Sequence, residues 1–389
     1  MKLSVKFTTC GYSNCDIEIR AKGFLAALVF WADLNGPLSG WSSFAAIPIQ
    51  ATGNAHYRFE GSRAVPAGAT HIYVKCIAQD FSSVEEAVWE IPVKYRAADL
   101  DSEPLAEFSL MSDLHLSRKH GMIHSALRLA SSVILMPGDL TNDGYAEQFE
   151  GLRHCIEESA SDKLILSVTG NHDQLLHPDM ATINNYAGYY KFQKYLFQRS
   201  KKMGYSVYED ASGAYLVQIG EIEVIGLQCV SNYRKFVFPE SAQLKWLDRH
   251  LDHDDTAQWH IILCHAPLIA HNPHRKDGAP YLSRDAELQQ IVDSHKNIIF
   301  LSGHTHDSPS MKQGNVEYQA EKQILYIDAG SVTPTELSGE PLQPSEWKDG
   351  VITELTLYSE MIEIRTKSIR TGISYPRGYY WFRLEKDPI

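Results

Sequence analysis

The sequence predicts a layered α/β domain that follows a smaller N-terminal antiparallel β-sandwich. Three observations point to this arrangement. Residues 1–95 carry short stretches of alternating apolar and polar residues between turn signals, and they show no convincing helical period. From residue 105 onward, short apolar runs alternate with segments whose apolar residues recur every three or four positions. The length of 389 residues is also long for one domain and comfortable for two.

Alternating patterns identify the strands of the N-terminal region. They occur at residues 3–7, 72–76 and 87–93, and turn signals lie at 35–37, 52–54 and 66–68. Several short strands at this spacing are typical of an immunoglobulin-like or fibronectin-like sandwich. We therefore expect a β-sandwich over residues 1–95 and a polar linker over residues 96–104.

The second region contains the apolar runs expected of buried strands. Helical periodicity at residues 149–156, 244–251 and 288–292 separates or follows them, and residues 214–227 and 350–366 each have the pattern of a strand pair. We expect helices packed over sheet through residues 105–389. The runs are Phe108–Met111, Val133–Met136, Leu164–Val168, Ile261–Cys264, Ile298–Leu301 and Ile324–Ile327.

Composition limits the class of protein. Hydrophobic residues make up 44% and charged residues 22%, which is ordinary for a soluble protein with a sizeable core. The formal charge of −12 argues against a nucleic-acid partner held by a broad basic face, but it allows an anionic substrate if bound metal outweighs the local charge. No apolar stretch has the length of a signal peptide or of a membrane span.

Cysteine usage indicates the compartment. The six cysteines have no metal-ligand spacing, which favours free thiols in a reducing compartment, while a Cys10–Cys15 disulfide stays an open alternative. We therefore expect a soluble, cytoplasmic protein.

Residues of the metal-binding types follow directly after five of the apolar runs. In open sheets, ligands collect outside the carboxyl ends of the strands, so these five segments are expected to deliver their side chains to one place. Glycines precede three of the candidates, which indicates sharp turns or a close approach of the backbone. The candidate metal ligands are Asp113, His115, Asp139, Asn171, His265, His304 and His306.

The chemistry of this set favours a pair of metal ions. Oxygen and nitrogen donors without a thiolate suit Mn, Fe, Zn, Co or Ni. Seven ligands are too many for one ion but fit two ions that share one carboxylate. Asp-x-His and His-x-His on extended backbone would each place two ligands on the same side. Two divalent ions, two carboxylates and one hydroxide leave a net charge of about +1, which attracts a phosphate.

The five blocks together resemble the calcineurin-like metallophosphoesterase superfamily, whose pattern is Asp-x-His, Gly-Asp, Gly-Asn-His-(Asp/Glu), a His after a strand, and Gly-His-x-His. All five occur in this order over residues 105–310. The resemblance implies a four-layer sandwich of two mixed sheets flanked by helices. It also implies a hydrolase that cleaves phosphate mono- or diesters by in-line attack of a hydroxide bridging two divalent or trivalent ions.

The resemblance assigns a role to each candidate. One ion would be bound by Asp113, His115 and His306, the second by Asn171, His265 and His304, and Asp139 would bridge them.

His172 resembles the catalytic histidine of the superfamily, which does not bind metal. It would contact the phosphate and protonate the leaving oxygen. Asp173 or Asn142 would orient His172, and a loop-capping role stays equally open for both.

The motifs differ from those of two well-known branches of this superfamily, and the differences indicate which branch the sequence resembles most. Asn142 occupies the position of the metal-binding tyrosine of purple acid phosphatases, so a ferric-tyrosinate site is not expected. The segment Gly138–Gly144 lacks the arginine of Ser/Thr protein phosphatases, and Asp173 stands where they have glutamate. The blocks look more like bacterial members that act on small substrates, including class III cyclic-nucleotide phosphodiesterases.

Two other functions remain to be weighed against a small-molecule phosphoesterase. A nuclease of the same superfamily would need a basic groove, which the composition does not suggest. A non-catalytic, metal-stabilised binding protein would be expected to lack a ligand or His172, whereas all are present. A polar loop after His265 carries His271, His274, Arg275 and Lys276, where either a phosphate clamp or ordinary solvated residues fit.

Overall fold

The computed structural model describes residues 3–10, 15–21, 23–43, 45–49, 53–58, 65–66, 68–78, 84–91, 103–117, 120–174, 186–232, 235–238, 242–253, 257–272, 278–311, 316–333 and 349–384. The chain divides into two compact units, Met1–Glu103 with Gly372–Trp381, and Pro104–Thr371 with Phe382–Ile389. Most of the predicted linker 96–104 lies outside the described residues.

The N-terminal unit contains two antiparallel sheets, as predicted. One has the order β1 (Leu3–Cys10), β2 (Cys15–Ala21), β6 (Asn54–Arg58). The other has the order β4 (Gly36–Pro37), β3 (Phe24–Asp33), β7 (His71–Ala78), β8 (Val84–Glu90), and β5 (Ala45–Pro48) pairs with β3. Residues that alternate along the strands, such as Ile19, Val29 and Val74, meet in one buried cluster. This unit therefore has its own core.

Two mixed sheets are formed by the strands that follow the N-terminal sheets along the chain. The first has the order β11 (Leu164–Ser167), β10 (Val133–Met136), β9 (Ala106–Leu110), β21 (Val351–Leu357), β22 (Met361–Ser368), β23 (Ser374–Arg383). Strands β9, β10 and β11 are parallel, and β21 is antiparallel to β9 and to β22. The predicted pair at 350–366 is thus confirmed.

The second sheet has the order β12 (Val207–Glu209), β13 (Tyr215–Ile219), β14 (Ile222–Gly226), β17 (Trp259–Leu263), β18 (Ile298–Ser302), β20 (Ile324–Asp328), β19 (Val316–Gln319). Strands β14, β17, β18 and β20 are parallel. The predicted hairpin at 214–227 is the antiparallel pair β13 and β14. A short hairpin of β15 (Val230–Asn232) and β16 (Lys235–Val237) follows this part of the chain.

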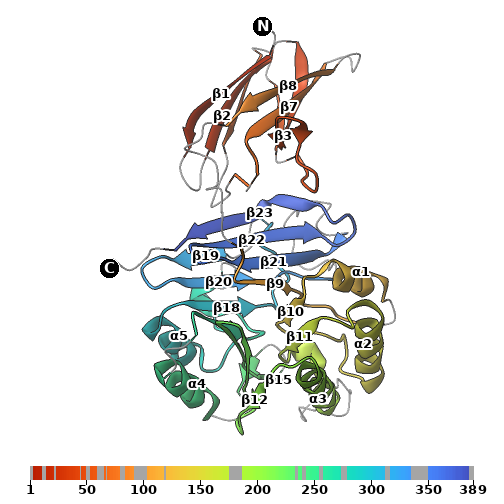
Figure 1. Ribbon diagram of the computed structural model, residues 1–389, viewed down its shortest axis with the longest axis vertical. Helices are drawn as coiled ribbons and strands as arrows, with labels where there is room; N and C mark the ends of the chain where they lie inside the picture. The colour runs from red at the N-terminus through yellow and green to blue at the C-terminus, as the bar shows by residue number, and fades with distance from the viewer. Residues whose placement is uncertain are drawn as a thin grey trace. The chain divides into compact units, whose positions relative to one another are not determined.

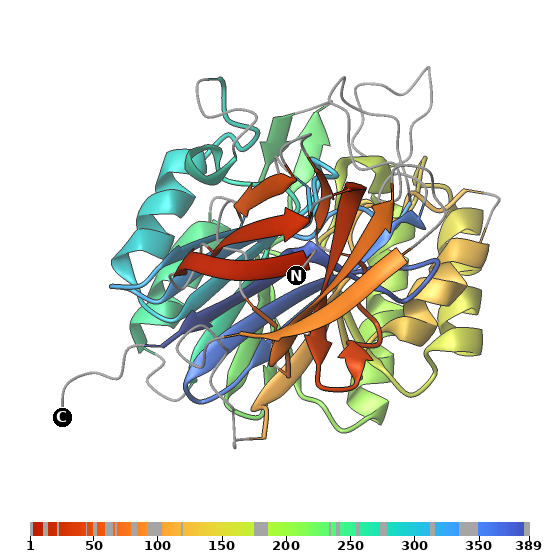
Figure 2. The ribbon, with the colours of Figure 1, turned by 90° about the horizontal axis from the view of Figure 1, so that it is seen from above.

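Helices cover the outer face of each of these two sheets (Figures 1 and 2). Side chains of α1 (Gly121–Leu129), α2 (Ala146–Ser159) and α3 (Ala187–Lys202) pack with β10 and β11. Side chains of α4 (Ala242–His253) and α5 (Asp285–Ser294) pack with β14, β17, β18 and β20. The predicted layered architecture is confirmed, although α1 and several short strands were not foreseen. None of the described helices has the length and hydropathy needed to cross a membrane.

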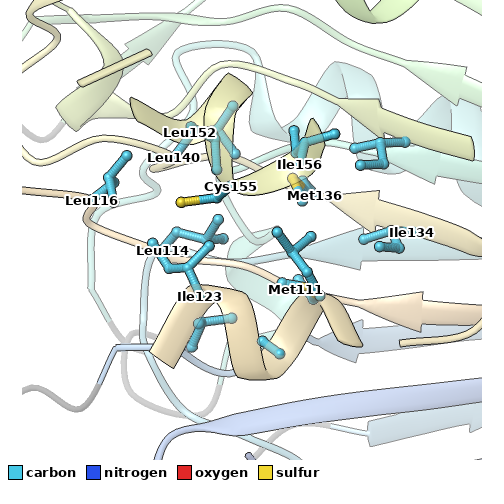
Figure 3. Close-up of a cluster of buried hydrophobic side chains, with 14 of the residues drawn as sticks. Met111, Leu114, Leu116, Ile123, Ile134, Met136, Leu140, Leu152, Cys155 and Ile156 are labelled. Atoms are coloured by element: carbon cyan, nitrogen blue, oxygen red, sulfur yellow. The ribbon is translucent and has the colours of Figure 1, made fainter. Parts of the chain in front are cut away.

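Buried apolar residues hold the loops that leave β9 and β10. Leu114 and Leu116 alternate with the candidate ligands Asp113 and His115, and both leucines are buried in the cluster between α1, α2 and the first sheet (Figure 3). Leu140 has the same place after Asp139. Because these loops are fixed by core packing on one side, their polar side chains are held toward the other.

We predict that Gly226→Ala destabilises the larger unit by about 1–3 kcal/mol, because the added methyl group overpacks the interior. A Cβ at Gly226 would lie 2.0 Å from Cε1 of the buried Tyr215 ring, whose hydroxyl donates to the carbonyl of Ser167. Urea unfolding followed by circular dichroism measures the effect. The control is Gly121→Ala, where a Cβ meets no atom within 4 Å. Equal stability of the two variants would contradict this packing.

Candidate metal centre

The loops after five strands supply the candidate ligands. Strands β9, β10 and β11 belong to the first sheet, and β17 and β18 belong to the second. The structure brings six of the predicted ligands into two compact groups of donor atoms, within each of which all donors lie within 4.8 Å of one another. The groups are Asp113, His115, Asp139 and His306, and Asp139, His265 and His304.

The first group is built around two facing imidazoles. Nε2 of His115 lies 3.1 Å from Nε2 of His306, and the same His306 nitrogen lies 3.1 Å from Oδ1 of Asp113. Nε2 of His115 is 3.9 Å from that carboxylate oxygen. Two ring nitrogens and a carboxylate that converge on one point, all on buried or nearly buried side chains, form a site for a cation.

The second group contains a buried nitrogen that needs a partner. The Nδ1–H of His265 donates to the carbonyl of Pro137 over 2.7 Å, so Nε2 is the ring nitrogen left for a metal ion. This Nε2 is fully buried and has no hydrogen-bond partner among the residues that the structure describes. It points to Asp139, whose Oδ2 is 3.4 Å away. Once Nε2 loses its proton, its lone pair would fit a metal ligand whose ring is fixed by the other nitrogen.

Asn171, the seventh candidate, lies beside the second group. Its Oδ1 is 3.0 Å from Nδ1 of His304. The amide oxygen therefore joins the donors around His304, as expected of a ligand from the loop after β11.

Asp139 belongs to both groups. Its Oδ2 lies 3.8 Å from Nε2 of His115 in the first group and 3.4 Å from Nε2 of His265 in the second. Its Oδ1 accepts a hydrogen bond of 2.8 Å from the backbone N–H of His172, which fixes the carboxylate. One oxygen atom thus faces two sets of ligands, which is the arrangement that a bridging carboxylate needs.

Charge balance dominates the electrostatics of this cluster. Burial alone would raise the pKa of Asp113 and of Asp139, but neighbouring imidazoles more than offset burial and lower both. Burial lowers the pKa of His115 to about 4 and that of His304 to about 3. For His265 the two carboxylates outweigh burial and raise the pKa to about 10. The carboxylates therefore remain charged and require positive charge beside them.

The backbone at the ligands differs from the expected conformation. Asp-x-His and His-x-His do not lie on extended backbone, because Asp113, His115, His304 and His306 have positive φ angles of 51°, 42°, 71° and 65°. Asp139 has a φ of 50°. Each strand therefore turns at its ligand instead of continuing. Left-handed conformations of residues other than glycine carry strain and concentrate at functional sites.

The glycines before the ligands permit close approach, as predicted. A Cβ on Gly170 would lie 2.1 Å from Oδ1 of Asp139, and one on Gly303 would lie 2.7 Å from Oδ2 of Asp113. Gly138 adopts a φ of 107°, which favours glycine. At these positions any side chain would collide with the carboxylates or strain the turn.

His172 lies at the edge of the centre and outside both groups of donors. Its ring centroid is 4.6 Å from that of His115, and its Nδ1 donates to the main-chain carbonyl of Asn142 over 2.8 Å. The ring is partly exposed. The backbone of Asn142, and not its side chain, therefore makes the contact that orients His172.

Asp173 contacts the loop after β10 and the loop after β11. Its fully buried carboxylate accepts hydrogen bonds from the backbone N–H groups of Gly170 and Thr141, over 2.8 and 3.0 Å. It also accepts from the Thr141 hydroxyl. These contacts tie the loop after β10 to the loop after β11 and support the capping alternative. Burial, with the nearby charge of Asp139, raises the pKa of Asp173 to about 7.

Two aromatic rings beside His304 were not found by the sequence analysis. The ring centroid of Phe236 lies 5.0 Å from that of His304 and 5.5 Å from that of His265. The centroid of Tyr281 lies 4.5 Å from that of His304. Nothing in the local sequence distinguishes these rings from core aromatics, because their position depends on β16 and a distant loop.

The polar loop after His265 is described only in part. His271 is buried, stacks on Tyr326 with ring centroids 3.5 Å apart, and lies 2.9 Å from Oε2 of Glu317. His274, Arg275 and Lys276 lie outside the described residues.

Comparison with known proteins agrees with this geometry. The model of the calcineurin-like phosphoesterase family matches residues 108–308, just over half of the chain. The chain belongs to this family.

A protein named "Probable cyclic nucleotide phosphodiesterase" from Synechococcus sp. is 27% identical to the chain over 177 residues. The match covers 45% of this chain and 58% of that relative.

We predict that metal binding is coupled to proton release. Because the pKa of His265 is raised to about 10, this ring is protonated in the metal-free protein at neutral pH, and a bound ion must displace the proton. The affinity for Mn²⁺ should rise between about pH 6.5 and about pH 8.5. Calorimetry in buffers of different ionisation enthalpy measures the protons released. His265→Gln should release fewer protons than the wild type on binding Mn²⁺. His154→Gln, a change at an exposed position of α2, should release as many as the wild type.

The same proton also stabilises the metal-free fold. Since the folded pKa of His265 lies above the unfolded value of about 6.5, its contribution is complete below that pH and is lost as the pH rises through about 10. An affinity for Mn²⁺ that does not change with pH would contradict this linkage.

Proposed function

We propose that the chain is a binuclear-metal phosphoesterase that hydrolyses a small phosphate mono- or diester. The observation that carries the proposal is the position of Asp139 Oδ2 between two converging sets of donors, with His172 beside them. A single shared carboxylate is what distinguishes a two-ion site from an ordinary buried ion pair.

The donor set fits two ions of the Mn, Fe, Zn, Co or Ni type. When bound, such ions would supply a water molecule of lowered pKa for in-line attack on phosphorus and would neutralise the developing charge. Asp139 would contact both ions. Asp113, His115 and His306 would hold one ion, and Asn171, His265 and His304 the other.

His172 is proposed as the general acid. Because its Nδ1 donates to the carbonyl of Asn142, its Nε2 is the nitrogen available to the substrate. A proton at Nε2 would pass to the leaving oxygen as the bond to phosphorus breaks. Asp173 would act indirectly, as a positioning residue that holds the loop carrying His172 against the loop carrying Asp139.

A cyclic nucleotide is the first substrate to test. The printed name of the Synechococcus sp. relative supports this class of diester, and the family membership supports phosphate-ester hydrolysis more generally. A cyclic nucleotide is small and carries one negative charge, which suits a site whose net charge with two divalent ions and one hydroxide is about +1.

We predict that Asp139→Asn and His172→Ala each lower kcat for bis(p-nitrophenyl) phosphate and for cyclic nucleotides by at least about 100-fold. Asp139→Asn should also lose bound Mn²⁺, because it weakens both ion sites, whereas His172→Ala should retain it. Matched controls are Asp162→Asn and His154→Ala, both exposed. Steady-state kinetics and metal analysis of the purified proteins provide the measurements.

Undiminished turnover in either site variant would contradict the role given to that residue. Wild-type protein that binds two ions but cleaves single-stranded DNA and none of the small esters would favour the nuclease alternative. Binding of two ions without hydrolysis of any ester would favour a non-catalytic protein.

A further inference from the structure

Thr305 lies between two ligands that belong to different groups. His304 is part of the second group of donors and His306 is part of the first. Both histidines have left-handed backbone, with φ angles of 71° and 65°. A short, strained segment with one residue in its middle therefore spans both candidate ion sites, and the surroundings must hold that residue in place.

The N–H and the hydroxyl group of Thr305 both make hydrogen bonds. Its N–H donates to the carbonyl of Gly303 over 2.8 Å, and its Oγ1 accepts from the N–H of Asp307 over 3.2 Å. Its hydroxyl donates to Oδ2 of Asp328, a residue distant in sequence. The first two contacts are within the loop. The contact with Asp328 is the one that fastens the loop to the sheet.

Asp328 is well placed to serve as a fixed point. It is the last residue of β20, pairs in register with Ser302 at the end of β18, and is only 3% exposed. Neither group of donor atoms includes it. Burial of this carboxyl group is costly, and the hydrogen bond donated by the Thr305 hydroxyl offsets part of that cost.

We propose that Thr305 and Asp328 form a lock that fixes the positions of both ion sites at once. Both are positioning residues, since they act through the two histidines that flank Thr305. The proposal rests on the proposed binuclear site. The consequence is specific. Loss of the lock weakens the binding of both ions together, whereas loss of a ligand such as His306 weakens first the binding of the ion that it contacts.

The test measures metal binding, independently of turnover. Thr305→Val removes the hydroxyl at nearly constant shape, and Asp328→Ala removes the acceptor. We expect each change to weaken both Mn²⁺ binding steps by about 10–100-fold, as measured by calorimetry and by metal analysis after equilibrium dialysis. Thr305→Ser and Asp328→Asn keep a donor and an acceptor, and both should bind within a few-fold of wild type.

Two further measurements separate a lock from general destabilisation. The double variant Thr305→Val with Asp328→Ala should bind no more weakly than either single variant, because the two residues act through one contact. Thr366→Val removes another buried threonine hydroxyl, one that pairs with Thr353 in β21 and β22, and should leave both binding steps unchanged.

Several outcomes would overturn the lock. They are wild-type affinity in Thr305→Val, weakening of only one binding step, losses that add in the double variant, or an equal loss in Thr366→Val. If Asp328→Ala does not fold, the metal affinities of Thr305→Val and Asp328→Asn still test the lock. Wild-type protein that binds fewer than two ions would instead refute the proposed function, so the two failures are distinguishable.

Discussion

The arrangement of the centre depends on two buried carboxylates that must be balanced by positive charge. Asp113 and Asp139 are fully or almost fully inaccessible to water, and burial alone would favour their neutral forms. The surrounding imidazoles keep them charged instead. An uncompensated buried charge would cost several kcal/mol, so both sheets must bring their histidines to this point. Convergence of the strand ends follows from that requirement.

The convergence of these loops requires strained backbone conformations. Five ligand positions adopt left-handed angles, and glycines occupy the places where a Cβ would meet the carboxylates. The apolar anchors Leu114, Leu116 and Leu140 lie on the opposite side of the same loops. Packing of these leucines and the clamp of Asp173 between Thr141 and Gly170 together hold a strained geometry in place.

The strands that carry the candidate site could be predicted from the sequence, for physical reasons. Parallel strands buried on both faces read as continuous apolar runs, and the residues directly after them lie at one edge of a sheet. The runs at Val133–Met136 and Ile298–Leu301 therefore located β10 and β18 correctly, and the candidate ligands Asp139 and His304 lie in the loops that follow them. For the candidate ligands spaced two residues apart, the expectation of extended backbone was wrong, because side-chain periodicity does not report φ.

Other features depended on contacts between distant residues and left no local signal. The orientation of His172 by a main-chain carbonyl, the rings of Phe236 and Tyr281, and the pairing of Thr305 with Asp328 are of this kind. Helix α1 was overlooked although Ile123, Ala126 and Leu127 have helical spacing, since the segment is short and begins without a side-chain cap.

The most direct test of the central claim is anomalous X-ray diffraction from crystals grown with Mn²⁺. Two anomalous peaks about 3.5–4 Å apart, both within coordination distance of the Asp139 carboxylate, are the expected result. A single peak, or peaks that leave Asp139 bound to only one ion, would contradict a shared carboxylate.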